Sequence, residues 1–332
     1  MIIAGDIGGT KTNIALFESD GRGIGSITTL ESFPSSEYVS LDSILDEFVS
    51  KHRPRLTHAC FGIAGPVIGG HVDATNLAWA VSTEGLAGAL GVKSAALIND
   101  LEAMAYGVET LTPAQLHTVN PGDSPQRHGH RALIAAGTGL GVAGIFWDGA
   151  HYHPMPSEGG HIDFAPRTAL ESDLLEWLTE KVGDHVSYER ILSGPGLLNI
   201  YSFLLDKRFA GEVPELAREI RAAEDPSAAI SKSALAKESE LAMEALDMFV
   251  EIYGAMAGNL ALILKSVGGV FVGGGIAPKI LEKMKDGAFL KTFLDKGRMK
   301  HLVASMPVHI ILDNKTSLYG AARCALNQGR VD

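Results

Sequence analysis

The sequence has few cysteines and no long uninterrupted apolar run. Cys60 and Cys324 are its only cysteines, too few for a disulfide framework or a cysteine zinc site, and this count fits a reducing cytosol. The longest apolar stretch, 254–264, is broken by Asn259 and ended by Lys265, and the N-terminus lacks the basic and then apolar pattern of a signal peptide. A cytoplasmic protein without a membrane segment is therefore expected.

Basic residues are also in deficit. The chain has 28 Lys and Arg against 39 Asp and Glu, which gives a formal net charge of −11 at pH 7. Because nucleic acids and anionic membranes attract basic surfaces, neither is expected as a partner. The rest of the composition, 46% hydrophobic and 20% charged over 332 residues, is typical of a globular protein long enough for two domains, each with its own core.

The N-terminus predicts a β-hairpin with a glycine tip. An apolar run at 2–7, the pair Gly8 and Gly9, and an alternating apolar run at 13–17 predict a strand, a tight turn and a returning strand. Glycine has no Cβ, so such a turn can bring backbone N–H groups close to a phosphate. An ordinary hairpin turn is the structural alternative, since glycine turns are common in β-hairpins.

Polar side chains flank this tip. The hydroxyls of Thr10 and Thr12 would add donors for a phosphate. Asp6 would repel a phosphate directly and is instead expected to hold a hydrated Mg²⁺, which takes one or two carboxylates together with phosphate oxygens. A Walker A loop is excluded, because it needs glycine before its Lys-Thr pair and a helix after it, whereas Thr10 precedes Lys11 and Thr12 and a strand follows.

Strand and helix patterns predict two α/β halves. Three strands in a meander, followed by alternating helices and strands, predict a mixed sheet in the first half. The polar segment 112–131 is expected to be a linker or a surface excursion. Beyond it the first hairpin repeats, as a strand at 132–136, a glycine turn at 137–141 and a returning strand at 142–147.

Helical patterns dominate the second half. Thr168 and Glu171 have the spacing of a capping box ahead of a helix that ends near Val182. Helical periodicity continues in several segments from 187 to about 265, and the last predicted helix covers 317–326.

The second glycine turn carries a competing interpretation. Residues 139–144 satisfy the dinucleotide-binding pattern letter by letter, but a strand is expected from Val142, where that pattern requires a helix. The glycines are therefore expected at a hairpin tip that resembles the turn at Gly8 and Gly9. Two such tips, one in each half, could hold a polyphosphate from both sides. An NAD-dependent oxidoreductase stays the alternative enzyme class.

A third glycine segment follows a predicted buried strand at 267–272. Gly273, Gly274 and Gly275 precede a helix start at Pro278, and the N–H groups at such a start suit the adenosine or α-phosphate end of a nucleotide. Close packing of a helix on a strand is the structural alternative.

Asn99 and Asp100 lie at the C-terminal end of a predicted strand, where α/β sheets place their ligands. The Asp100 carboxylate could accept the proton of an attacking hydroxyl, and the Asn99 amide could bind further hydroxyls of the substrate. The alternative is structural, because Asn-Asp before a helix is a good N-cap.

Glu158, His161 and Glu189 form a second polar set. Carboxylate acceptors with an imidazole suit a sugar, whose ring offers donors around its whole edge. A zinc site of His151, His153, Glu158 and His161 is the alternative, although the spacing matches no standard helical zinc motif.

Six motifs span nearly the whole chain, at 6–13, 97–100, 137–141, 157–165, 187–194 and 273–276. Together and in this order they closely resemble those of the bacterial glucokinase family, within the hexokinase, actin and Hsp70 superfamily. The resemblance implies two ribonuclease H-like α/β domains of mixed β-sheet flanked by helices, with an interdomain cleft. The small domain is expected at 1–110 plus 302–332, completed by the C-terminal helix, and the large one at 111–301.

The resemblance also implies ATP-dependent phosphorylation of the glucose 6-hydroxyl to glucose 6-phosphate, which enters glycolysis. ATP and Mg²⁺ are the implied cofactors, and Asp6 would bind the metal through water. Carried over position by position, Asp100 matches the general base, and the substrate ligands match Asn99, Asp100, Glu158, His161 and Glu189. The nucleotide-binding positions are Asp6, Gly8, Gly9, Thr10, Lys11, Thr12, Gly137, Thr138, Gly139, Gly141, Gly273, Gly274 and Gly275.

Glucose and ATP are thus the expected partners, and the resemblance suggests a homodimer. The alternatives are a sugar kinase of broader hexose specificity and a non-catalytic relative that senses sugar or nucleotide. The cysteine-rich zinc motif of the related repressor and sugar kinase group is missing, which counts against a transcription-factor relative.

Overall fold

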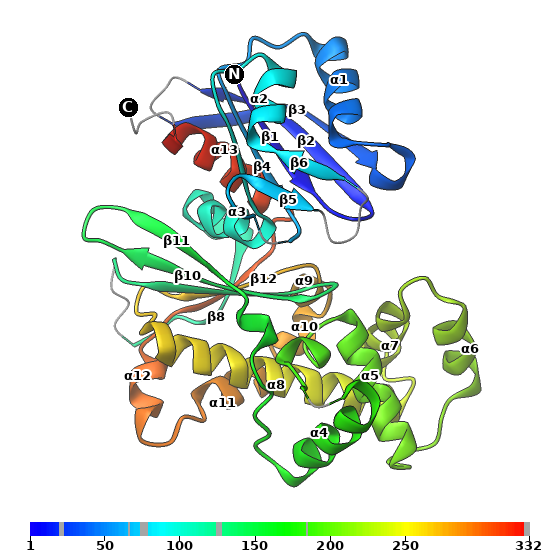
Figure 1. The fold of residues 1–332 in the computed structure, drawn as a ribbon. Helices are drawn as coiled ribbons and strands as arrows, with labels where there is room; N and C mark the ends of the chain where they lie inside the picture. The colour runs from blue at the N-terminus through cyan, green and yellow to red at the C-terminus, as the bar shows by residue number, and fades with distance from the viewer. Residues whose placement is uncertain (20–22, 66, 74–78, 124–127, 184, 329–332) are drawn as a thin grey trace. The chain divides into compact units, whose positions relative to one another are not determined.

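The computed structural model describes residues 1–19, 23–65, 67–73, 79–123, 128–183 and 185–328. The chain divides into two compact units. The first comprises 1–113, 153–156 and 313–332, and the second comprises 114–152 and 157–312. Each unit has its own main β-sheet with helices against it (Figure 1), so the predicted mixed α/β class is confirmed. The predicted domain boundaries stay a prediction.

The first unit is built on a five-stranded sheet of order β3-β2-β1-β4-β7. Its strands are β1 (Ile2–Ile7), β2 (Lys11–Ser19), β3 (Ile24–Pro34), β4 (His58–Ile63) and β7 (Ala95–Asn99). β1 pairs antiparallel with β2 and parallel with β4, which pairs parallel with β7. The predicted meander is confirmed, and β5 (His71–Asp73) and β6 (Ala80–Ser82) form a separate hairpin.

Helices cover both faces of this sheet, because alternate residues of a strand point to opposite sides. Ile3 and Ile7 of β1 belong to an apolar cluster with α1 (Leu41–His52) and α2 (Thr83–Leu90). Ile2 and Ala4 belong to the opposite cluster, which includes residues of α3 (Asp100–Gly107) and α13 (Thr316–Gln328).

Two glycines allow α3 and α13 to pack with their backbones in contact. A Cβ on Gly320 would collide with the Ala103 carbonyl oxygen, and a Cβ on Gly107 would collide with the Thr316 carbonyl oxygen. The absence of side chains at these positions therefore sets the position of α3, the helix whose first residue is Asp100.

The second unit contains most of a six-stranded sheet of order β11-β10-β9-β12-β13-β8, in which residues 153–156 of the edge strand β11 are assigned to the first unit. Its strands are β8 (Leu116–Asn120), β9 (Arg131–Ala136), β10 (Leu140–Trp147), β11 (Tyr152–Ser157), β12 (Val270–Gly273) and β13 (Val308–Ile311). Its first five strands repeat the order of the first sheet, with a meander followed by two parallel strands, so the predicted repetition of the hairpin is confirmed.

The strand β8 corrects the prediction that 112–131 is only a linker or surface excursion. Leu116–Asn120 pairs antiparallel with β13 at the edge of the sheet, and β9 already begins at Arg131. No residue of β8 is fully buried, so its sequence lacks the apolar signal of a central strand.

Nine helices of the described part of the second unit surround or extend from its core (Figure 1). They are α4 (Ala169–Val182), α5 (Gly194–Asp206), α6 (Pro214–Ala222), α7 (Pro226–Leu235), α8 (Glu240–Leu264), α9 (Ile276–Lys279), α10 (Leu281–Met284), α11 (Ala288–Leu294) and α12 (Lys300–Ala304). α8 is long and apolar enough to cross a membrane by length and composition, but 72% of its most apolar window is buried inside the protein. It is the central helix of the apolar core.

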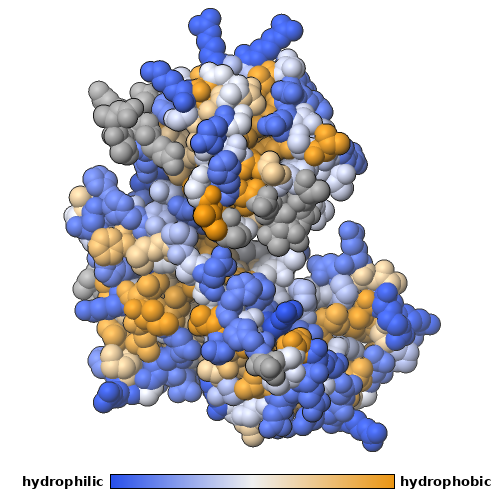
Figure 2. All heavy atoms as spheres, in the orientation of Figure 1, coloured by the Kyte–Doolittle hydropathy of each residue, from blue (hydrophilic) through white to orange (hydrophobic). Residues whose placement is uncertain are grey.

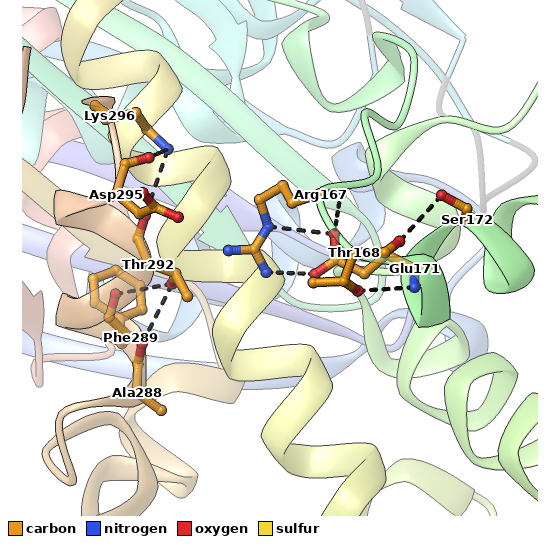
Figure 3. Close-up of polar contacts among 9 residues, drawn as sticks. All are labelled: Arg167, Thr168, Glu171, Ser172, Ala288, Phe289, Thr292, Asp295 and Lys296. Atoms are coloured by element: carbon orange, nitrogen blue, oxygen red, sulfur yellow. Dashed lines mark hydrogen bonds and ion pairs between the residues drawn. The ribbon is translucent and has the colours of Figure 1, made fainter. Parts of the chain in front are cut away.

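The start of α4 shows how the predicted capping box is realised (Figure 3). Thr168 is the N-cap, and its hydroxyl accepts the Glu171 N–H at 3.1 Å. The Glu171 carboxylate bonds to the backbone N–H of Arg167 at 2.7 Å and forms an ion pair with the Arg167 guanidinium. The glutamate thus reaches one residue further back than a capping box requires, because the arginine offers it a charged partner there.

Apolar side chains are not confined to the cores. The most exposed of them in the described residues are Val39, Ile68 and Ile263. On the visible face, hydrophilic side chains lie between the hydrophobic ones (Figure 2).

We predict that Gly320→Ala destabilises the first unit by about 1–3 kcal/mol, because the new methyl group overpacks the contact between α13 and α3. Gly88→Ala is the matched control, since Gly88 lies in the exposed part of α2 and its Cβ would meet no atom within 4 Å. That change should stabilise by about 0.5–1 kcal/mol through helix propensity. Denaturant unfolding of both variants checks the prediction, and equal effects would contradict it.

Candidate functional site

The first glycine turn is a tight β1–β2 turn that a serine from a later segment completes. The Gly8 N–H donates to the Lys11 carbonyl at 3.0 Å. Ser35, at the start of the 3-10 helix Ser35–Glu37, donates its N–H to the Thr10 carbonyl at 3.0 Å and its hydroxyl to the Gly8 carbonyl at 2.7 Å. The predicted hairpin tip is confirmed, and Ser35 fixes its shape.

Thr12 lies on the buried side of this turn. It has no exposed surface, and its hydroxyl bonds to the Ser35 hydroxyl at 3.0 Å, whereas Thr10 and Lys11 are exposed. In this structure Thr12 therefore supports the turn through Ser35, and its contact with a nucleotide stays a prediction. Sequence reasoning missed Ser35, because a serine after Pro34 at the end of a strand resembles any loop serine.

The carboxyl ends of three parallel strands meet at one edge of the first sheet. The register places Ile7 beside Ile63, and Ile63 beside Asn99. The first glycine turn, which follows Ile7, and Asp100, which follows Asn99, therefore leave the sheet at the same edge. In α/β sheets this is the edge where ligands bind.

Two carboxylates interact at this edge. Asp6 is mostly buried, and this burial, together with the negative charge of Asp100, raises the pKa of Asp6 from 3.8 to about 6, against an opposing hydrogen bond from Asn13. The repulsion that Asp100 exerts shows that the two side chains are electrostatic neighbours. A cation between them would relieve it.

Asn99 and Asp100 start α3. The Asn99 side-chain oxygen accepts the Leu101 N–H at 2.9 Å, so the N-cap alternative is confirmed for Asn99, and its amide group donates to the Gly65 carbonyl at 3.1 Å. Asp100 Oδ1 also accepts the Leu101 N–H, at 2.8 Å. The positive end of the helix therefore stabilises the negative charge of Asp100. Sugar contacts of both residues stay predictions.

The acidic groups suit a hydrated magnesium ion better than a protein-only metal site. In the part of the chain that the structure describes, no three His, Cys, Asp or Glu side chains gather around a common point, and this includes the zinc alternative at His151, His153, Glu158 and His161. Mg²⁺ needs only one or two carboxylates when phosphates and water supply its other ligands. The Asp6 carboxylate fits that donor set.

The second glycine turn joins β9 to β10 in the second unit. The Gly137 N–H donates to the Gly139 carbonyl at 2.9 Å, and the Gly137 carbonyl accepts the Gly194 N–H at 2.9 Å. Thr138 is exposed at the tip. Because a strand follows Gly139, the helix that a dinucleotide fingerprint requires is absent, and the hairpin prediction is confirmed.

Glu189 completes this turn. It lies in the 3-10 helix Tyr188–Arg190, and its carboxylate accepts the Leu140 N–H at 2.9 Å. The carboxylate lies so close to Gly139 that a Cβ there would collide with it. The structure thus brings a predicted sugar ligand directly against the predicted phosphate turn.

Glu158 directly precedes the 3-10 helix Gly159–His161, which packs on β10, and His161 is its last residue. Ser157 donates its hydroxyl to the Val142 carbonyl at 2.6 Å, and Glu158 forms an isolated bridge with Val142. Glu158 Oε2 and His161 Nε2 are 4.0 Å apart, with 71% and 59% of their side chains exposed. Glu158 and His161 therefore lie in a segment that packs against the start of β10, the same part of the strand that Glu189 contacts.

The third glycine segment lies beside the second turn. Gly273 ends β12 and pairs with Ala135 of β9. Gly274 has a φ of +82°, and a Cβ there would collide with the Ala136 carbonyl. The short helix α9 begins at Ile276, so the helix start predicted at Pro278 is two residues late. The segments predicted to bind phosphate and adenosine are therefore neighbours in the second unit.

The chain is similar to glucokinases over almost its whole length. A family model described as Glucokinase matches residues 3–328. A glucokinase of Nostoc punctiforme is 44% identical over 338 residues, which cover 98% of each chain. The crystal structure of a glucokinase from an Antarctic psychrotroph gives a TM-score of 0.82 at 30% identity and 98% coverage of both chains. A ROK family glucokinase from Streptomyces griseus, solved with glucose and AMPPNP, gives a TM-score of 0.65 at 21% identity, covering 98% of this chain and 99% of that one.

We predict that Asp6→Asn stabilises the protein at high pH and not at low pH. The folded-state pKa of Asp6, about 6, lies above its ordinary value of 3.8, so folding costs free energy once Asp6 ionises. The gain should be small at pH 4, grow between pH 4 and 6, and level off at about 3 kcal/mol above pH 7. Melting temperatures from pH 4.5 to 8 test this, with the exposed Asp46→Asn as control. A gain independent of pH would contradict the assignment.

We predict that Ser35→Ala loosens the first glycine turn. The Gly8 carbonyl and the Thr12 hydroxyl lose their partner, which should cost about 1–3 kcal/mol of stability and weaken nucleotide binding more than sugar binding. Calorimetric titration with AMP-PNP and with glucose measures the two affinities. Ser50→Ala, an exposed change in α1, should leave both unchanged, and equal losses for both ligands in Ser35→Ala would count against a role at the turn.

Proposed function

The chain belongs to the glucokinase family, and we propose that it transfers the γ-phosphoryl group of ATP to the 6-hydroxyl of glucose, releasing ADP and glucose 6-phosphate. The match of the family model to residues 3–328 and the 44% identity to a full-length relative support this activity. Glucose and AMPPNP in the Streptomyces griseus structure are the substrate and an ATP analogue that the proposal requires.

The observation that carries the mechanism is the shared edge of the first sheet. The register of β1, β4 and β7 sets a glycine turn, Asp6 and Asp100 together there. A phosphoryl transfer needs backbone donors for the phosphates, a carboxylate for the cation and a carboxylate for the acceptor hydroxyl. These three functions are all represented at that edge.

Asp100 acts as the general base in this mechanism. Its carboxylate accepts the proton of the glucose 6-hydroxyl as that oxygen bonds to the γ-phosphorus, while the bond from the γ-phosphorus to the bridging oxygen of ADP breaks. The Leu101 N–H at the start of α3 donates to this carboxylate and orients it. Asp6 would hold Mg²⁺, which neutralises phosphate charge when bound.

The proposed sugar ligands are polar side chains. Asn99, Glu158, His161 and Glu189 would bind the ring hydroxyls, and the two carboxylates would accept hydrogen bonds from them. Glucose is the proposed sugar, and a broader hexose range is the alternative. The Mg²⁺ requirement, the homodimer, the cytoplasmic location and the role at the start of glycolysis belong to the proposal through the family resemblance.

We expect Asp100→Asn to lower kcat by about 100-fold or more, because the amide cannot accept the proton. Glucose affinity should change little. An assay that couples glucose 6-phosphate formation to a dehydrogenase measures turnover, and calorimetry measures glucose binding. Asp46→Asn should match the wild type. Near-normal turnover in Asp100→Asn would disprove the role of this base.

The same wild-type protein decides between the alternatives. ADP release should be fast with glucose, slower with mannose or fructose, and negligible without sugar. Comparable rates on all three hexoses would indicate a broader hexose kinase, and binding of sugar and nucleotide without turnover would indicate a sensing relative.

A further inference from the structure

Tyr253 places a polar group inside the apolar core of the second unit. It lies in α8 and has no exposed surface. Its ring makes edge-to-face contacts with Phe249 and Phe289, with centroids 5.9 and 5.8 Å away. Because interiors are close-packed, these neighbours leave the ring one orientation.

The Tyr253 hydroxyl reaches the ends of two strands. It accepts the Ala136 N–H at 3.1 Å, and the carbonyls of Ile134 and Gly273 lie 3.4 and 3.5 Å away as acceptors for its proton. Ala136 is the last residue of β9, directly before the second glycine turn, and Gly273 is the last residue of β12. One hydroxyl thus lies under both predicted nucleotide segments.

The two strands separate at this point. Their last paired residues are Gly273 and Ala135, after which β9 bends into the turn and β12 continues into Gly274. The Ala136 N–H lies just beyond this last pair, and the tyrosine supplies its acceptor. A buried N–H group without an acceptor is strongly unfavourable, so the Tyr253 hydroxyl stabilises this end of β9 by accepting the Ala136 N–H.

The chemical form of the side chain suits that purpose. Burial raises the pKa of Tyr253 well above its ordinary value of 10, so the phenol stays neutral. A neutral hydroxyl can accept one hydrogen bond and donate another, whereas a phenolate could only accept.

We propose that Tyr253 is a positioning residue that holds the phosphate turn at Gly137–Gly139 and the adenosine-side segment at Gly273–Gly275 in one fixed geometry for nucleotide binding. The inference rests on the proposed function for the identity of the nucleotide. The close contact between Gly274 and the Ala136 carbonyl leaves neither segment room to shift without the other.

A second buried tyrosine offers the matched comparison. Tyr201 of α5 is only 3% exposed and belongs to the same apolar core, but its hydroxyl has no hydrogen-bond partner among the described residues. Tyr201→Phe therefore removes a buried hydroxyl of the same unit without releasing a backbone group.

The first test compares Tyr253→Phe with Tyr201→Phe by calorimetry and kinetics. In Tyr253→Phe, the Kd for AMP-PNP and the KM for ATP should rise about 5- to 10-fold, a change that matches the loss of a single hydrogen bond. The Kd for glucose should stay within about twofold, and Tyr201→Phe should leave both ligands unaffected. A lower melting temperature with unchanged nucleotide affinity, or equal losses for nucleotide and glucose, would overturn the positioning role.

The second test uses hydrogen exchange, and its first measurement needs only the wild type. In the wild type, saturating AMP-PNP should slow exchange in the peptides that contain 136–138 and 273–275 together, and protection of only one would overturn the proposal. In Tyr253→Phe without nucleotide, both peptides should exchange faster than in Tyr201→Phe.

The outcomes also separate this proposal from the proposed function. If the wild type binds AMP-PNP but does not phosphorylate glucose, the proposed function fails, and the binding and exchange measurements still decide the role of Tyr253. If the wild type does not bind AMP-PNP, both proposals are wrong. If it phosphorylates glucose and Tyr253→Phe binds AMP-PNP normally, only the positioning role is wrong.

Discussion

A chain that leaves a sheet in a sharp turn must find new hydrogen-bond partners for its backbone groups, and both glycine turns depend on this constraint. In the first turn, Ser35 donates hydrogen bonds to the carbonyls of Gly8 and Thr10. In the second turn, the Glu189 carboxylate accepts a hydrogen bond from the Leu140 N–H, and the Gly194 N–H donates one to the Gly137 carbonyl. The glycines permit the bends, but residues from other segments fix their shape.

Strands, hairpins and helix ends that depend on residues adjacent in the sequence are predicted well. The meander and both hairpins follow from alternating apolar runs around glycines, and their repetition at 132–147 reveals the second sheet. Ser40 caps α1 and Gly91 ends α2 in the left-handed conformation, as serine and glycine commonly do at helix ends. These features are local, so a single sequence is enough to find them.

Contacts between distant residues are beyond such reasoning. Ser35 is 27 residues from Gly8, and Glu189 is 49 residues from Leu140. Nothing near either residue indicates its partner, because register and packing decide it. The family resemblance singles out Glu189 as a sugar ligand but gives no sign that it also supports the phosphate turn. The edge strand β8 was missed for a related reason, since a half-exposed strand carries little apolar pattern.

Asn99 illustrates a case in which two alternatives are compatible. The structure shows it as the N-cap of α3, yet the same cap places Asp100 at the first position of the helix. A residue that caps a helix at a sheet edge necessarily lies where ligands approach, so the structural role and the proposed binding role arise from one position.

The two neighbouring carboxylates of the first unit differ in a way that favours their proposed division of roles. Asp100 lies at a helix N-terminus and receives an N–H group, both of which favour its charged form. Asp6 is the penultimate residue of β1 and is largely buried, and burial together with the repulsion of Asp100 raises its pKa to about 6 against the hydrogen bond from Asn13. An acceptor of a proton must be ionised before reaction, whereas a cation ligand can become ionised when the cation arrives. The N-terminus of α3 therefore suits Asp100 as the proton acceptor, and a position near the end of β1 suits Asp6 as a cation ligand.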